Sequence, residues 1–171
     1  MVSVETWAER LGDNLPPFSA AAFSWRDARR AAELATQPSS MPVTLIGHSM
    51  GGGCAQLIAQ RLPAGSIETL ITVAPFAPRE VKPHKVRAKV GYWLNIVSAR
   101  SWQSTLLGFA GRCFLGWRDQ GPIVEATENH FSGHPHRDFY RLISGRCGPV
   151  EHGNFVPPEG ALRKFASRGE R

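Results

Sequence analysis

Cysteines and long apolar runs are both scarce in this sequence of 171 residues, and each scarcity excludes a class of protein. The three cysteines, Cys54, Cys113 and Cys147, are too few and too scattered for a disulfide framework or a zinc knuckle. Because no run of about 18 apolar residues occurs, the sequence predicts no membrane span. The first residues are acidic and lack the apolar core of a secretory signal, so the cytoplasm is the expected compartment.

Motifs for nucleic-acid binding are also absent, although the net charge of +6 would permit an anionic partner. The densest basic stretch, REVKPHKVRAK at residues 79–89, contains no interleaved aromatic residue, so it predicts a solvated loop and no nucleic-acid partner. The length suffices for one sizeable core. We expect a single domain over residues 1–150 and a polar tail over residues 151–171.

Segments typical of strands alternate with segments typical of helices along the chain. Strands are expected at residues 43–46, 67–73, 90–99 and 121–127, with a weaker one at 17–25. Helices are expected at residues 26–37 and 54–62 and, in the aromatic connector, at 101–117, where an apolar substrate pocket is the alternative. This alternation predicts an α/β fold with a mostly parallel sheet and helices on both faces, that is, three layers.

The segment VTLIGHSMGGGCAQLIAQ, residues 43–60, places Ser49 between a short apolar strand and an amphipathic helix. A nucleophile at such a junction needs a sharp, strained turn, and Gly47 and Gly51 would let the two backbones approach closely. The N-terminus of the helix offers free N–H groups and the positive end of a dipole, both suited to an oxyanion. The context therefore favours a nucleophile elbow over an ordinary glycine-rich turn.

Three neighbouring residues receive roles from this interpretation. Ser49 is predicted to be the nucleophile, the main-chain N–H of Met50 one oxyanion donor, and His48 a substrate-binding residue. Because the G-x-S-x-G spacing alone is a weak signal, a turn that carries no chemistry remains the alternative.

The strand–elbow–helix form of VTLIGHSMGG, residues 43–52, resembles the signature of the α/β-hydrolase superfamily of serine esterases, lipases and thioesterases. The stretch FSWRDARRAA, residues 23–32, is similar to the strand and helix before the elbow in some lipase-like members. The resemblance spans residues 18–142, and its specific part is the elbow. It implies a serine hydrolase with no cofactor and no metal, whose partner is a small-molecule or lipid-like acyl substrate, an ester or thioester.

The resemblance also implies a histidine base in a loop that follows the last strand. The segment ENHFSGHPHRDFYRL, residues 128–142, contains three candidates for it. His134 is the first choice because it follows a glycine, and His136 and His130 are the alternatives.

The acid of the expected triad is harder to place, because the loop after residues 90–99 holds no carboxylate. Asp119 is the first choice, and the other candidates are Glu80, Glu128 and Asp138.

The chain departs from the family pattern at its start as well. Before Ser49 no strand with a His-Gly-type loop is visible, although such a loop normally supplies the second oxyanion N–H. We therefore expect an N-terminally shortened hydrolase that lacks early strands, with weak self-association through its exposed sheet edge. Loss of one oxyanion donor lowers the rate by roughly 10²–10³-fold, so a degenerate, non-catalytic hydrolase-like fragment is one alternative.

A metal-dependent hydrolase is the second alternative. The stretch HPHRD contains the H-x-H-x-D spacing of His134, His136 and Asp138, which occurs in metallo-hydrolases. Imidazole and carboxylate groups can bind zinc, but no complete ligand set is visible in the sequence.

Overall fold

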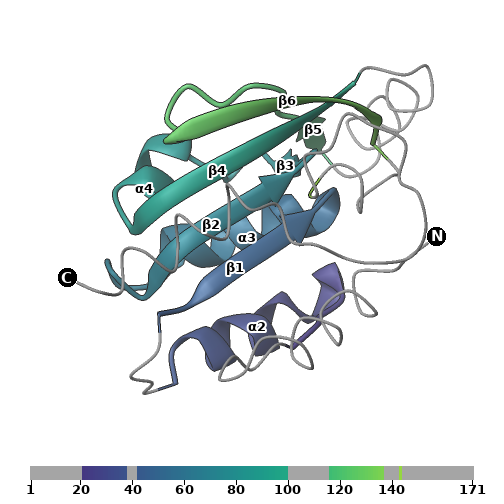
Figure 1. Cartoon of the computed structure of the whole chain (residues 1–171). Coiled ribbons are helices and arrows are strands. Elements are labelled where there is room, and N and C mark those ends of the chain that lie inside the picture. Colours follow the sequence, from purple (N-terminus) through teal and green to yellow (C-terminus); the bar gives the residue numbers. More distant parts are fainter. Residues whose placement is uncertain (1–20, 38–41, 100–115, 137–142, 144–171) are drawn as a thin grey trace, which may run out of the picture.

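The computed structural model describes residues 21–37, 42–99 and 116–136 together with Ile143, and Figure 1 shows how they are arranged. A parallel sheet of four strands, in the order β1-β2-β4-β6, forms the centre of the fold. Its strands are β1 (Thr44–His48), β2 (Ile67–Val73), β4 (Val90–Ala99) and β6 (Glu128–Pro135). The predicted α/β fold with a parallel sheet is thereby confirmed.

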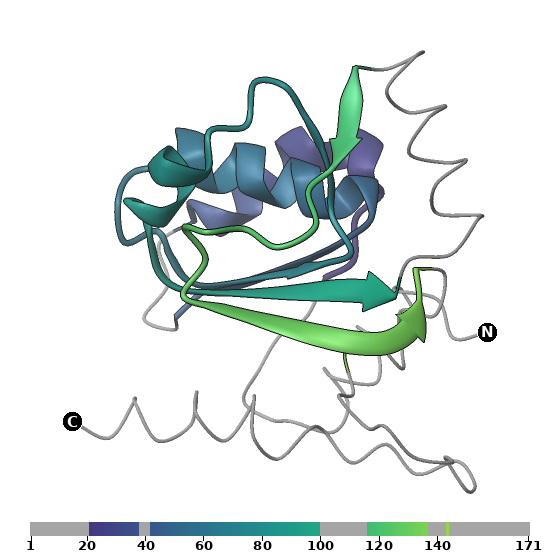
Figure 2. The same ribbon diagram turned by 90° about the horizontal axis from the view of Figure 1, so that it is seen from above.

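The helices among the described residues all cover the same face of this sheet. The 3-10 turn η1 (Trp25–Asp27) leads into α2 (Ala28–Ala35), and α3 (Met50–Arg61) and α4 (Pro83–Arg87) follow along the chain. Figure 2 shows α2, α3 and α4 on the same side of the sheet. The described residues thus contribute the sheet and one helical layer of the three layers expected.

The core lies between this helical layer and the sheet. Continuous apolar runs in β2 and β4 bury one set of side chains against α3 and α4, as parallel strands do. Fully buried examples are Leu70, Val86 and Trp93. The indole N–H of Trp93 donates to Thr72 Oγ1 over 3.1 Å, so the polar group of this large side chain is also satisfied.

A second, two-stranded antiparallel sheet lies beside α3 and was not predicted. It consists of β3 (Phe76–Pro78) and β5 (Trp117–Asp119). Gln56 of α3, which is fully buried, exchanges side-chain hydrogen bonds with Gln120 directly after β5. This pair of amides fixes β5 to the helix that follows the elbow.

The predicted strand at residues 121–127 is wrong, because these residues form turns and the strand begins only at Glu128. The side chain of Asn129 accepts a hydrogen bond from the Ile123 N–H and donates one to the Ile123 carbonyl, each over 2.9 Å. These two bonds fold the segment back, so Ile123 is buried while Val124 is 94% exposed.

Other expectations have mixed outcomes. Residues 21–24 of the weak strand have no regular structure, and the basic stretch expected to be a loop contains α4. Residues 17–20, most of the aromatic connector (101–115) and the tail lie outside the described residues. No helix among the described residues is long and apolar enough to cross a membrane.

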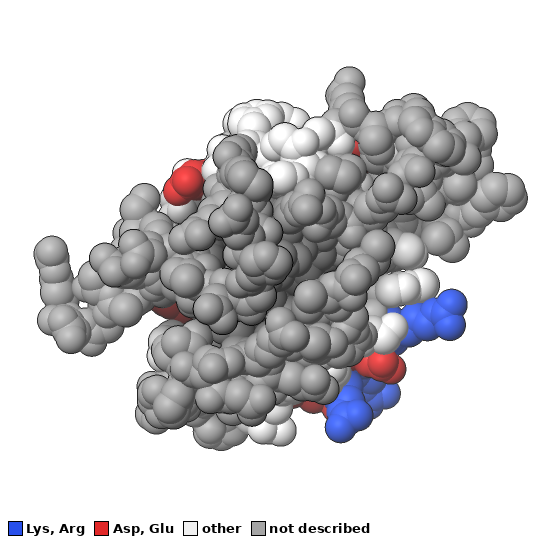
Figure 3. Space-filling model, turned by 45° about the vertical axis from the view of Figure 1, so that its right-hand side comes forward, with Lys and Arg blue, Asp and Glu red and all other residues white. Residues whose placement is uncertain are grey.

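In Figure 3 the visible basic side chains lie at the lower right, next to acidic ones. On α2, Arg29 and Glu33 form an exposed ion pair over 3.0 Å, one helical turn apart. Such exposed pairs stabilise a helix by about 0.3–0.5 kcal/mol, so this one has little influence on the fold.

Candidate functional site

Ser49 occupies a strained turn between β1 and α3. Its backbone has φ 55° and ψ −123°, a conformation that non-glycine residues rarely adopt. The Ser49 N–H donates to the Val73 carbonyl, and the Ser49 carbonyl accepts from the Phe76 N–H, each over 2.9 Å. The neighbouring chain therefore holds the strained residue from both sides, as is common at active sites.

The glycines around Ser49 are required by close backbone contacts, with one exception. A Cβ added to Gly47 would lie 2.4 Å from the carbonyl oxygen of Gly51, and one added to Gly53 would lie 2.1 Å from that of Phe76. A Cβ added to Gly52 would lie 2.8 Å from the Cβ of Pro75. A Cβ on Gly51 itself would meet nothing within 4 Å, which corrects the expected steric need for that glycine.

His136 is the histidine that the structure brings to Ser49. Its Nε2 lies 2.9 Å from Ser49 Oγ, and the residue is 8% exposed. The first choice from the sequence, His134, and the alternative His130 both lie within β6, because the strand runs on to Pro135. His136 is the first residue after the strand, and the carboxyl ends of parallel strands meet at one edge of a sheet.

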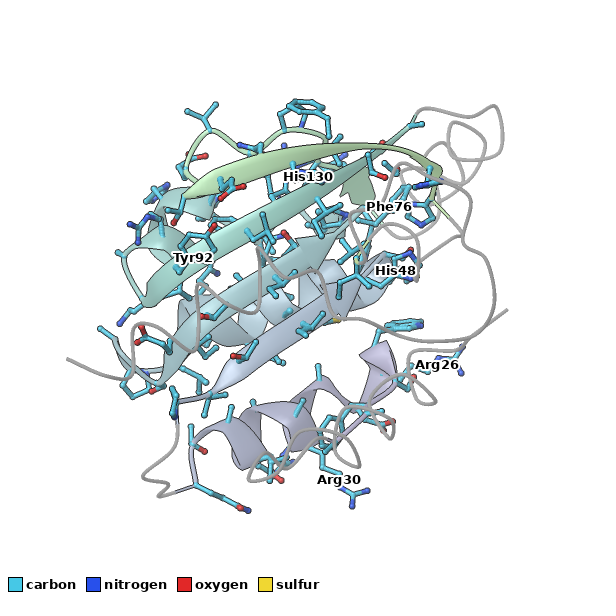
Figure 4. All side chains as sticks on the ribbon, in the orientation of Figure 1. Arg26, Arg30, His48, Phe76, Tyr92 and His130 are labelled. Carbon is cyan, nitrogen blue, oxygen red and sulfur yellow. The ribbon has the colours of Figure 1, made fainter. Side chains whose placement is uncertain are left out.

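Two aromatic rings contact His136. The ring of Phe76 in β3 packs edge-on against it, with centroids 5.1 Å apart, and the ring of His48 lies 5.2 Å away. His48 Nε2 also lies 2.8 Å from the main-chain oxygen of His136. Figure 4 shows His48 and Phe76 near the ends of the strands to which the β1 and β4 arrows point.

Burial sets the protonation of both histidines. Desolvation, helped by the neighbouring His48, lowers the pKa of His136 from 6.5 to about 4, while the Asp119 carboxylate opposes this shift. Desolvation also lowers the pKa of His48, against the opposing effect of its hydrogen bond to His136. Both rings are therefore neutral at pH 7, and Nε2 of His136 is available to accept the Ser49 proton.

The acid candidates lie in different places. Asp119 is exposed on β5, where its Oδ1 accepts from the Gly121 N–H over 3.2 Å. Its charge acts on His136, but within the described residues no hydrogen bond joins the two side chains. Glu80 is exposed in the segment before α4, and Glu128 accepts from the Tyr92 hydroxyl over 2.6 Å.

Met50 and the possible metal ligands complete the set of predicted residues. Met50 is the first residue of α3, where a main-chain N–H has no acceptor within the helix, as an oxyanion donor requires. Among the described residues no group of three or more His, Cys, Asp or Glu side chains could hold a metal ion, and Asp138 lies outside them.

Sequence reasoning missed one residue of the site, Phe76. An apolar residue after Ala74-Pro75 carries no local sign of contact with a histidine, and the pairing of β3 with β5 places it there. The positive φ of 44° at Ala74 indicates a second strained position beside the elbow, which the sequence did not reveal either.

Comparison with known proteins gave one finding. A family model, Hydrolase_4, described as serine aminopeptidase, S33, matches residues 20–126. No curated protein and no solved structure matches the chain. The matched segment contains the elbow and the strands β1 to β5, whereas β6 and His136 follow it along the chain.

Proposed function

The chain belongs to the Hydrolase_4 family of α/β-hydrolases (serine aminopeptidase, S33), and from this premise we propose that it is a serine hydrolase of acyl esters or thioesters. The observation that carries the proposal is the distance of 2.9 Å between His136 Nε2 and Ser49 Oγ at a strained elbow. A nucleophile and a base within hydrogen-bond reach are the minimum requirement for acyl transfer.

The reaction would proceed in two halves. Ser49 Oγ attacks the acyl carbon while His136 Nε2 takes its proton, and the Met50 N–H donates to the oxyanion that forms. The protonated His136 then gives its proton to the leaving oxygen or sulfur, which leaves an acyl group on Ser49. Water then attacks the acyl carbon while His136 takes its proton, and His136 returns that proton to Ser49 Oγ as the carboxylic acid leaves.

Asp119 would act on this cycle through its charge. In a triad the acid orients the histidine and stabilises the imidazolium. The Asp119 carboxylate raises the pKa of His136, so it favours the imidazolium without the hydrogen bond that would orient the ring. We therefore assign the stabilising part of the acid's role to Asp119.

The weak basicity of His136 favours activated acyl substrates. With a pKa of about 4, His136 forms an imidazolium less readily than an ordinary histidine, which penalises the step that deprotonates Ser49. Because every substrate shares that step, the penalty is best tolerated by substrates whose acyl carbon is already activated toward attack. Thioesters and aryl esters should therefore react faster than alkyl esters, and peptide amides slowest.

A fluorophosphonate probe with mass spectrometry and an assay with a short-chain aryl ester test the proposal together. We expect the probe on Ser49, and we expect Ser49→Ala to abolish labelling and turnover while thermal unfolding stays cooperative. Ser66→Ala, at the opposite end of the sheet before β2, is the matched control and should retain both. Turnover that survives in Ser49→Ala would remove Ser49 from the mechanism.

A non-catalytic hydrolase-like domain is the second candidate function. The observation that favours it is the lack, within the described residues, of a carboxylate hydrogen-bonded to His136. A folded wild-type protein that neither takes up the probe nor cleaves any of the four substrate classes would support this candidate over the enzyme.

A further inference from the structure

We propose that His48 is a positioning residue, which holds His136 against Ser49 by a hydrogen bond to its main chain. This role rests on the serine-hydrolase function proposed above. His48 was predicted to bind substrate, and the geometry points to this different role because the contact of its Nε2 is with the protein itself.

The contact spans the width of the sheet. His48 ends β1 and His136 follows β6, and these strands lie at opposite ends of the order β1-β2-β4-β6. Adjacent strands are about 4.8 Å apart, so a residue that follows β6 must cross the ends of β4 and β2 to reach Ser49. The pairing of β4 with β6 shifts register between Val97 and Ala99, and Figure 1 shows the end of β6 curving toward the other strands.

A segment that crosses the ends of two strands needs an interaction that fixes its last residue, His136, beside β1. The His136 carbonyl can only accept, so the hydrogen bond of 2.8 Å requires a proton on His48 Nε2. Burial lowers the pKa of His48 and keeps the ring neutral, with its single proton on that nitrogen. The bond joins residues 88 positions apart, directly beside the nucleophile.

Two contacts then define where the imidazole of His136 lies. His48 holds the main chain of the residue, and Phe76 packs edge-on against its ring at 5.1 Å. In a triad an acid hydrogen-bonded to the ring provides this orientation. Since Asp119 acts on His136 by charge alone among the described contacts, His48 and Phe76 supply the orientation instead.

Two substitutions separate the hydrogen bond from the volume of the ring. His48→Leu replaces the imidazole by an apolar side chain of similar size and so removes the hydrogen-bond donor. In His48→Gln, the side-chain Nε2 of glutamine can donate from nearly the same place. Misplacement of a reacting group by about 1 Å can cost 10²-fold, so we expect kcat to fall about 10- to 100-fold in His48→Leu. KM should stay unchanged, and His48→Gln should recover most of kcat.

The experiment measures four quantities on each variant: kcat and KM for an aryl ester, the rate of Ser49 labelling by the fluorophosphonate, and hydrogen–deuterium exchange of β6. His84→Leu, on the exposed surface of α4, is the matched control. We expect slower labelling and faster exchange of β6 in His48→Leu only.

Each contrary outcome has its own meaning. If His48→Leu is labelled as fast as wild type, or its exchange is unchanged, the positioning role is overturned while the hydrolase function stands. If KM rises and kcat is retained, His48 binds substrate as the sequence predicted, which also overturns the role. If wild type takes up no probe and cleaves no ester, the proposed function fails, and the exchange measurement still decides whether His48 holds β6.

Discussion

At the scale of single residues, the elbow depends on glycines at which a side chain would collide with a neighbouring backbone. Gly47 and Gly53 face carbonyl oxygens at distances that no Cβ tolerates, and Gly51 faces open space. The four glycines of the segment therefore differ in what they do, although the sequence pattern treats Gly47 and Gly51 alike.

We expect Gly53→Ala to destabilise the fold by more than about 2 kcal/mol, because the added methyl group would have to displace the backbone of β3. Gly51→Ala is the matched control on the same helix. It should change the free energy of unfolding by less than about 1 kcal/mol, in the stabilising direction, since alanine favours helix over glycine. Urea unfolding of the two variants provides the comparison, and equal losses would contradict the contact geometry.

The same scale shows what local sequence can predict of a site. The position of Ser49 at a strained turn between strand and helix could be predicted because the signal for an elbow is local, a strand and a helix around two glycines. The choice among His130, His134 and His136 depended on where β6 lies. The hydrogen bonds between Asn129 and Ile123 hold the preceding segment in turns, so the strand begins at Glu128 and runs on to Pro135. A strand placed seven residues too early moved all three histidines into the loop.

At the scale of elements, few interactions among the described residues attach β5 to the helix behind the elbow. Its pairing with β3 covers three residues, and the partly buried amide pair of Gln56 and Gln120 adds the contact with α3. Since β3 carries Phe76 and β5 carries Asp119, this small sheet positions two of the groups that act on His136.

We expect Gln56→Leu to destabilise the protein by about 1–3 kcal/mol, because it leaves the amide of Gln120 without its partner in a partly buried site. The double variant Gln56→Leu, Gln120→Leu should recover much of this loss, as replacing both partners by apolar groups costs less than replacing one. Chemical unfolding of the two single variants and the double variant gives the coupling energy. Strict additivity of the two losses would show that the pair contributes nothing.

The elements also differ in how well they could be predicted from the sequence. The strands β2 and β4 were predicted to the residue, because long buried runs bounded by polar residues have one interpretation. The three-residue strands β3 and β5 carry no such pattern, since their pairing arises from contacts with α3 and the elbow. Helix α4 was missed because it has only five residues, two of them the charged Lys85 and Arg87, and only Val86 is buried.

At the scale of the whole molecule, burial of two histidines links stability to pH. Both pKa values are lowered in the folded chain, that of His136 from 6.5 to about 4, so between these pH values the unfolded chain binds more protons. The free energy of unfolding therefore falls as pH drops from 6.5 toward 4, and this loss is absent above pH 6.5.

We expect the melting temperature to fall across this window and His136→Gln to remove part of the fall, since glutamine does not titrate. Thermal unfolding followed by circular dichroism between the two pKa values and at neutral pH measures the effect. His84→Gln, at an exposed position, is the control and should retain the full pH dependence.

Turnover should persist in the same window, with an acidic midpoint near 4, because His136 stays unprotonated there.

The separation of Ser49 and His136 along the chain also has a consequence during synthesis. The two residues are 87 positions apart, and ribosomes add about 5–20 residues per second, so the elbow leaves the ribosome about 4–17 s before its base. A nascent chain can form the β1–α3 unit early, yet Ser49 stays without a proton acceptor until β6 pairs with β4. Under the proposed function, the order of these residues along the chain thus delays attack on acyl groups until the fourth strand of the sheet has been made.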